Sequence, residues 1–160
     1  MYGWPLLKTT DEITTAAADG KIGFISEDDI ADIAVQFLTS QKPLGGVEPI
    51  LVGPESLSYD QVSRVLIFGK PDQYSMQIAE QLSEVLGRKI THRKVSVEER
   101  KSGFMTIGVA NWLAGMLASS EANFHATGRE EKMISEKSDK AIGKTRFIEF
   151  AEANKAAWQK

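Results

Sequence analysis

Three polar residues follow the first apolar run of the chain and could meet a ligand. The run spans residues 21–25, and Ser26, Asp28 and Asp29 come directly after it, where a strand should give way to a helix. Ligands of open α/β sheets lie beyond the carboxyl ends of the strands, so these side chains are candidates for a substrate-side site. Ser26 and Asp29 also fit a capping box, in which the hydroxyl accepts a hydrogen bond at a helix start. Capping and the helix dipole already explain these residue types, so this second interpretation is favoured.

Trp112 and Met116 are candidates of another kind, because both could line a pocket for an aromatic substrate. They also continue the spacing of Met105 and Val109 at i, i+4, i+7 and i+11. That spacing is typical of the buried stripe of a helix. A core position is therefore the favoured interpretation.

His92 could act as an acid or base at the rim of a pocket. Arg93 and Lys94 follow it on a predicted strand, which favours an exposed position. The chain has no cysteine, and its two histidines, His92 and His125, are separated by 32 intervening residues, so no metal site is predicted. No residue is assigned as catalytic or as cofactor-binding.

Composition excludes several classes of partner. The net charge is −3, which gives no general attraction to nucleic acid or to an anionic membrane. No run approaches the roughly 20 apolar residues that cross a bilayer, and the first residues lack the pattern of a secretory signal. The absence of cysteine fits the cytosol, so a cytoplasmic protein is expected.

Strand and helix patterns alternate along the chain and predict a small α/β unit. Residues 1–18 lack a sustained apolar period and are expected to form a poorly ordered lead-in to a domain over residues 19–160. Strands are predicted at 21–25, 49–54 and 89–95. Helices are predicted after Ser26, Ser58 and Ser96 and from about Thr145, with a break near Gly103, Gly108 or Gly115. The helix after Ser26 should bury Ile30, Ile33, Ala34, Phe37 and Leu38, and the last should bury Phe147, Phe150, Ala151 and Trp158.

The helix pattern after Ser58 is interrupted by residues 62–77, which contain Gly69 and Pro71. If these sixteen residues are removed, Gln61 joins Ile78 and one regular helix results, with Gly87 suited to its C-terminal end. Codons for Val-Ser and for Gln can reproduce the two ends of a eukaryotic intron, so a retained intron is one hypothesis. The other is two consecutive helices joined by a turn, and both remain open.

Three segments resemble the NmrA-like atypical short-chain dehydrogenase/reductase family. They are residues 19–31, residues 50–60 continued by 82–90, and Gly143-Lys144-Thr145 with Phe150 and Trp158. Within that family the chain is most similar to the fungal ergot-alkaloid reductases of the festuclavine synthase and agroclavine dehydrogenase type. Residues 113–116 add to this similarity. The resemblance covers most of the chain from Asp19 onward, apart from residues 62–77.

The resemblance implies the carboxy-terminal, substrate-side part of a Rossmann-type fold, with the nucleotide-binding half missing. It implies NAD(P)H-dependent reduction of a small molecule, such as an alkaloid iminium, in fungal secondary metabolism. The chain has no G-x-G-x-x-G motif after a strand and no Tyr followed four residues later by Lys. It is therefore not expected to bind the cofactor alone. Because the cofactor carries the hydride chemistry, the chain is expected to be a truncated, inactive form. The alternatives are a non-catalytic binding module that associates with another chain, or a redox-sensing remnant of NmrA type.

Overall fold

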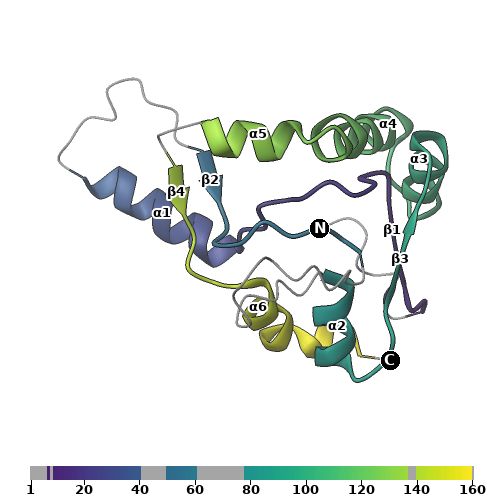
Figure 1. Cartoon of the computed structure of the whole chain (residues 1–160), viewed down its shortest axis with the longest axis horizontal. Helices are drawn as coiled ribbons and strands as arrows, with labels where there is room; N and C mark the ends of the chain where they lie inside the picture. The colour runs from purple at the N-terminus through teal and green to yellow at the C-terminus, as the bar shows by residue number, and fades with distance from the viewer. Residues whose placement is uncertain (1–6, 8, 41–49, 61–77, 137–139, 160) are drawn as a thin grey trace, which may run out of the picture.

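The computed structural model describes residues 7, 9–40, 50–60, 78–136 and 140–159. In this part of the chain two separate pairs of parallel strands are covered by helices. Figure 1 shows one pair on the right, the other on the left, a row of helices along the top, and two packed helices at the bottom. The mixed α/β architecture agrees with the fold class predicted from the sequence.

The right-hand pair joins β1 (Glu12–Thr15) to β3 (Thr91–Lys94), in a register that places Thr15 opposite Lys94. β1 lies within the segment for which a poorly ordered lead-in was predicted, so that prediction is wrong for residues 12–15. A four-residue strand has no long apolar period of its own, and its partner lies about 80 positions further along the chain. Pattern reading along a short window cannot detect such a non-local pairing.

The left-hand pair joins β2 (Ile50–Val52) to β4 (Lys140–Ile142). β2 confirms the strand predicted within residues 49–54. Its carboxyl end leads into Gly53, where a Cβ atom would lie 1.5 Å from the carbonyl oxygen of Phe24. Only glycine permits this close approach of two backbone segments.

The segment at residues 21–25 is extended but does not form the predicted strand. It forms one isolated antiparallel bridge between Ile22 and Leu57, with N···O distances of 2.9 and 3.0 Å, and the carbonyl oxygen of Gly23 accepts from the N–H of Gly53 at 3.4 Å. The backbone N–H of Gly23 instead donates to the side chain of Glu130 at 3.3 Å. The segment therefore passes between helices and loops and is held by side chains as well as by backbone pairing.

Helix α1 (Glu27–Thr39) begins where its cap predicted, because the Ser26 hydroxyl accepts from the N–H of Asp29 at 3.1 Å. Its predicted apolar face is largely open. Of that face only Ile33 is buried, whereas Ile30 is 43% exposed and Leu38 is 85% exposed. Most of the helix's apolar surface thus remains uncovered by the described residues.

The main core lies where α2 (Ile78–Leu86) packs against α6 (Phe147–Ala153) and the β1–β3 pair. A short 3-10 turn, Lys155–Ala157, carries Trp158 into the same core. The largest fully buried apolar side chains are Leu7, Leu57, Ile78, Leu82 and Ile90. These contacts confirm the predicted burial of Phe147, Ala151 and Trp158, while Phe150 is partly buried.

Four helices form the row along the top and right of Figure 1. They are α3 (Val97–Thr106), α4 (Asn111–Ser120), the π-helix η2 (Glu121–Ala126) and α5 (Arg129–Glu136). α3 and α4 pack together around Phe104, Ala114 and Ala118. The chain breaks between them at Gly108, whose φ of +87° favours glycine, as the glycine pattern predicted.

The predicted retained-intron segment, residues 62–77, lies outside the described residues. The residues on either side of it are informative. The N–H of Ile78 donates to the carbonyl oxygen of Ser58 at 3.1 Å. If Gln61 were joined to Ile78, this would be the first i to i+4 bond of a helix capped by Ser58. The carbonyl oxygen of Ser58 and the N–H of Ile78 are thus placed as in the first turn of such a helix.

Candidate functional site

A chain of polar contacts connects the ends of β1 and β3 to the segment before α2. The Thr15 hydroxyl lies 2.8 Å from Nε2 of His92, and Nδ1 of His92 lies 2.8 Å from a carboxylate oxygen of Asp60. The Lys94 ammonium lies 2.9 Å from the other oxygen of Asp60. The side chain of His92 is only 1% exposed, so the prediction that it would be exposed is wrong. Its neighbours Arg93 and Lys94 form ion pairs at the surface while the imidazole turns inward.

The charge state of Asp60 follows from these contacts. Burial alone would raise the pKa of its carboxyl group, but hydrogen bonds from His92 and Lys94 outweigh burial and lower it. Asp60 is therefore a carboxylate that orients the His92 ring. The same geometry occurs in hydrolytic triads, but Thr15 is 1% exposed and its hydroxyl also accepts from the N–H of Ala17 at 3.2 Å. The arrangement is suited to holding the fold together.

Tyr59 extends this buried region toward the top row of helices. Its ring packs edge-on against Phe24 with centroids 5.7 Å apart, and lies 5.5 Å from the His92 ring. Burial, with a further contribution from Glu121, raises the pKa of the Tyr59 phenol above its usual value. The phenol is therefore neutral at physiological pH.

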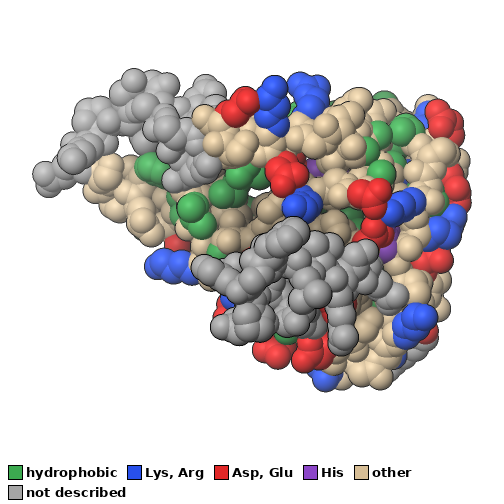
Figure 2. Space-filling model, viewed as in Figure 1, with side chains coloured by type: hydrophobic (Ala, Val, Ile, Leu, Met, Phe, Trp, Pro, Cys, Tyr) green, Lys and Arg blue, Asp and Glu red, His purple; other side chains and the backbone are tan. Residues whose placement is uncertain are grey.

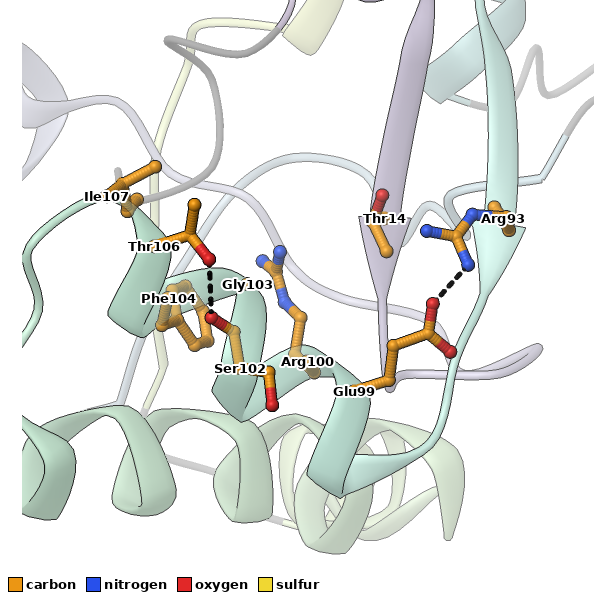
Figure 3. Close-up of a pocket in the computed structure, with 9 residues that line it drawn as sticks. All are labelled: Thr14, Arg93, Glu99, Arg100, Ser102, Gly103, Phe104, Thr106 and Ile107. Atoms are coloured by element: carbon orange, nitrogen blue, oxygen red, sulfur yellow. Dashed lines mark hydrogen bonds and ion pairs between the residues drawn. The ribbon is translucent and has the colours of Figure 1, made fainter.

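One hollow among the described residues, the β1 groove, is shown in Figure 3 between β1, β3 and α3 and has a volume of about 310 Å³. Its two guanidinium groups are already paired. Arg93 contacts Glu99 and lies 2.7 Å from Glu12, while Arg100 makes a two-pronged contact with Glu121 at 2.9–3.1 Å. Because these cations are neutralised, the groove offers little attraction to a phosphate or a carboxylate.

The second hollow, the β2 pocket, lies between β2 and the helices η2 and α5, and also has a volume of about 310 Å³. Its walls are mostly apolar, formed by β2 together with Phe124, Met133 and Ile134. Its polar contribution comes mainly from His125 and Glu130, whose Nδ1 and Oε2 atoms face each other. In Figure 2 hydrophobic side chains gather over β2 and β4, between α1 and α5. This combination of apolar walls with a few polar groups is typical of small-molecule sites.

Acidic side chains from the top row of helices hold the segment that runs from β1 to α1 against the pocket. Glu121 accepts from the N–H of Ala16 at 2.9 Å, and Glu130 accepts from the N–H of Gly23. Between these two anchors Gly20 passes so close that a Cβ atom would lie 1.8 Å from the carbonyl oxygen of His125. These contacts fix the position of the helical turn that carries His125.

The structure explains the three polar residues predicted near the start of α1. Ser26 is the helix cap, and the carboxylate of Asp29 accepts from the N–H groups of Lys144 and Thr145 at 3.1 and 2.9 Å. Burial alone would raise the pKa of Asp29, but these backbone hydrogen bonds lower it. Asp28 is exposed in the first turn. The capping interpretation of Ser26 is confirmed, and none of the three residues lines either hollow.

Trp112 and Met116 lie on the outer surface of α4, where they are 72% and 52% exposed. The predicted buried stripe from Met105 to Met116 is therefore wrong. The break at Gly108 shifts the phase of the helix that follows, so α4 buries Ala114 and Ala118 instead. Neither Trp112 nor Met116 lines one of the two hollows, and their role as substrate contacts stays a prediction.

The sequence did not predict the pair of His125 and Glu130. Residues five apart do not share a face of an α-helix, so the spacing gave no signal. They meet because η2 is a π-helix and a turn at Gly128, with φ of +70°, leads into α5. Among the described residues no group of three or more metal-ligating side chains gathers, and no helix is long and apolar enough to cross a membrane.

Comparison with known proteins identifies homologues along nearly the whole chain. The chain is 39% identical to festuclavine dehydrogenase of Aspergillus fumigatus, over 96% of its own length and 48% of that protein. It is 36% identical to agroclavine dehydrogenase of Claviceps purpurea, over 96% of its length and 47% of that protein. No known protein-family profile matches. The chain thus spans about half the length of the curated relatives it matches, and the resemblance inferred from the sequence is confirmed.

Solved structures support the same fold. The NADPH-dependent quinone oxidoreductase of Escherichia coli, solved in complex with NADPH, superposes with a TM-score of 0.64 at 19% identity. The superposition covers 96% of this chain and 51% of that protein. The chain therefore has the fold of about half of a Rossmann-like reductase.

Proposed function

Because the chain is a homologue of the festuclavine and agroclavine dehydrogenases, we propose that it forms the substrate-side part of an NAD(P)H-dependent reductase. Its substrate is a small molecule, such as an alkaloid iminium, of fungal secondary metabolism. The observation that carries this proposal is the 39% and 36% identity over 96% of the chain. Identity of this extent covers the helices and strands that form the β2 pocket.

The cofactor is proposed to be held largely by groups outside this chain. The superposed quinone oxidoreductase binds NADPH, and this chain matches about half of that protein. The 160 residues contain no G-x-G-x-x-G sequence, the motif that after a strand presents backbone N–H groups to a pyrophosphate. The hydride would therefore reach a substrate that this chain positions.

The β2 pocket is the proposed substrate site. Its lining comes from β2, η2 and α5, and in Figure 1 these elements lie side by side at the upper left of the molecule. The pocket is lined along the whole of β2 as well as by η2 and α5, and a mostly apolar hollow with a few polar groups is typical of small-molecule sites. The β1 groove fits this role less well, because its charged groups are paired with one another.

A chimera tests the proposal. The half of the Aspergillus fumigatus festuclavine dehydrogenase that this chain matches is replaced by this chain, in one version complete and in another with Gln61 joined directly to Ile78. We expect at least one chimera to oxidise NADPH in the presence of the parent enzyme's substrate, at a rate well above that without substrate. The parent enzyme is the positive control.

The contrary outcome is also informative. If both chimeras are folded by circular dichroism and bind NADPH, yet show no substrate-dependent oxidation, the reductase proposal fails. The non-catalytic binding module or redox-sensing remnant would then be the better description of this chain.

A further inference from the structure

We propose that the β2 pocket binds an apolar ring compound carrying one oxygen function, a hydroxyl or a carbonyl, and that Nε2 of His125 makes the polar contact with it. The inference rests on the proposed function only in taking the β2 pocket as the substrate site. Binding to the pocket can be measured on the chain alone, whereas reductase activity is measured on the chimera. The two proposals can therefore fail separately.

The position of the His125 ring is fixed from one side. Its Nδ1 pairs with Glu130, and the two side chains are only 20% and 16% exposed. The other oxygen of Glu130 accepts from the N–H of Gly23 at 3.3 Å, which anchors the carboxylate to the backbone. An imidazole held in this way is a pre-organised binding group and loses little freedom when a ligand arrives.

The remaining ring nitrogen is available. Among the described residues, no hydrogen bond to Nε2 of His125 is found, in contrast to His92, where both nitrogens are engaged. Nδ1 of His125 faces Oε2 of Glu130 without forming a hydrogen bond among the described residues, and in the tautomer that carries its proton on Nδ1 the Nε2 atom is an acceptor. Nε2 thus accepts from a hydroxyl when the ring is neutral and donates to a carbonyl when it is protonated.

The walls of the β2 pocket select for an apolar ring. Phe124 and Met133 line it and are 40% and 39% exposed, so large apolar side chains face open space there. The guanidinium of Arg129 lies 5.2 Å from the centre of the Phe124 ring and helps to hold that ring in place. A volume of about 310 Å³ suits a compound of two or three fused rings.

The test uses the purified 160-residue chain with 2-naphthol as the probe and naphthalene as the probe without a hydroxyl. Binding is followed by two-dimensional NMR of the backbone N–H groups and of the two histidine rings. We expect 2-naphthol to shift signals of β2, η2 and α5 and to perturb Nε2 of His125, and to bind about tenfold more tightly than naphthalene, the size of one net hydrogen bond. His125→Leu should abolish this tenfold preference, and His125→Gln should retain part of it.

The matched control is Thr106→Val, which alters the β1 groove and should leave both affinities unchanged. Backbone spectra of each variant report whether it is folded, and the wild-type protein alone gives the comparison of the two probes. The proposal is overturned if the wild-type chain binds neither probe, binds both equally, or shows its shifts at the β1 groove. It is equally overturned if a folded His125→Leu variant keeps the preference for 2-naphthol.

Discussion

The two histidines of this chain illustrate two uses of the same side chain. His92 is buried between β1, β3 and the segment before α2, and both of its ring nitrogens have partners. His125 lines the β2 pocket, where one nitrogen is held by Glu130. A buried imidazole whose two nitrogens both form hydrogen bonds stabilises the fold. An imidazole at a pocket, with one nitrogen that makes no hydrogen bond within the protein, can bind a ligand.

The same contrast extends to the two strand pairs. The β1–β3 pair adjoins the main core and is tied at its carboxyl ends by Thr15, His92 and Lys94. The β2–β4 pair adjoins a pocket, and nearby apolar side chains such as Ile142 and Leu38 are exposed. One region is complete within the described residues, and the other offers surface for a ligand or a further protein segment.

The largest expected effect separates the two histidines. His92→Leu removes the hydrogen bonds that the imidazole makes with the Thr15 hydroxyl and with the Asp60 carboxylate. It should lower the free energy of unfolding by about 3 kcal/mol. His125→Leu should lower it less, by about 1 kcal/mol, because His125 has one side-chain partner, Glu130, and remains 20% exposed. Urea unfolding of the two variants measures both values, and equal losses would refute the contrast.

Removal of residues 62–77 should raise the free energy of unfolding, whereas the histidine substitutions lower it. Joining Gln61 to Ile78 replaces a long connection by a peptide bond at the point where Ser58 already accepts the first helical hydrogen bond. Because a shorter connection costs less entropy to close on folding, the free energy of unfolding should rise by about 2 kcal/mol. The measurement is again urea unfolding.

The control for this deletion replaces residues 62–77 by sixteen glycine and serine residues, which keeps the length and removes the sequence. If the deleted protein is less stable than this control, the segment is an integral part of the fold and the hypothesis of a helix interrupted by an insert is wrong. That result would favour the alternative of two consecutive helices.

A smaller effect is expected at the start of α1, next to the β2–β4 pair. Asp29→Asn weakens the hydrogen bonds from Lys144 and Thr145 and should cost about 1.5 kcal/mol near neutral pH. Since the folded-state pKa of Asp29 is lowered, its contribution is fully present above the unfolded value near pH 4 and is lost as pH falls through the folded value. The difference between wild type and variant should therefore shrink below about pH 4. A difference that grows on acidification would contradict this.

The smallest effect is expected on the outer surface of α4. Trp112 is 72% exposed, so Trp112→Ser should change the free energy of unfolding by no more than about 0.5 kcal/mol. It should also leave binding to the β2 pocket unchanged. A loss of more than about 2 kcal/mol would show that Trp112 is buried, as its sequence spacing suggested.

Local signals predicted much of the fold. The caps at Ser26 and Ser96, the strand at β2 and the buried residues of α6 all follow from patterns within a few positions. The β1 strand was missed because its partner is remote in the sequence. The buried stripe through Trp112 failed because the turn at Gly108 changes the helix phase, and no periodicity reports the size of that change.

The contacts of the candidate site could be predicted from the sequence only to a small extent. His92 stands beside two cations, which suggested exposure, and its partners Thr15 and Asp60 lie 77 and 32 positions away. His125 and Glu130 meet only through a π-helical turn. Such contacts depend on tertiary packing, whereas residue type and spacing report mainly local structure.

The central claim is that this chain supplies a substrate pocket while the cofactor is held mainly outside it. Calorimetric titration of NADPH into the purified 160-residue chain, and in parallel into the folded chimera, tests this most directly. We expect saturable binding to the chimera and none to the chain over the same concentration range. Saturable binding to the chain alone, with an affinity close to that of the chimera, would contradict the claim.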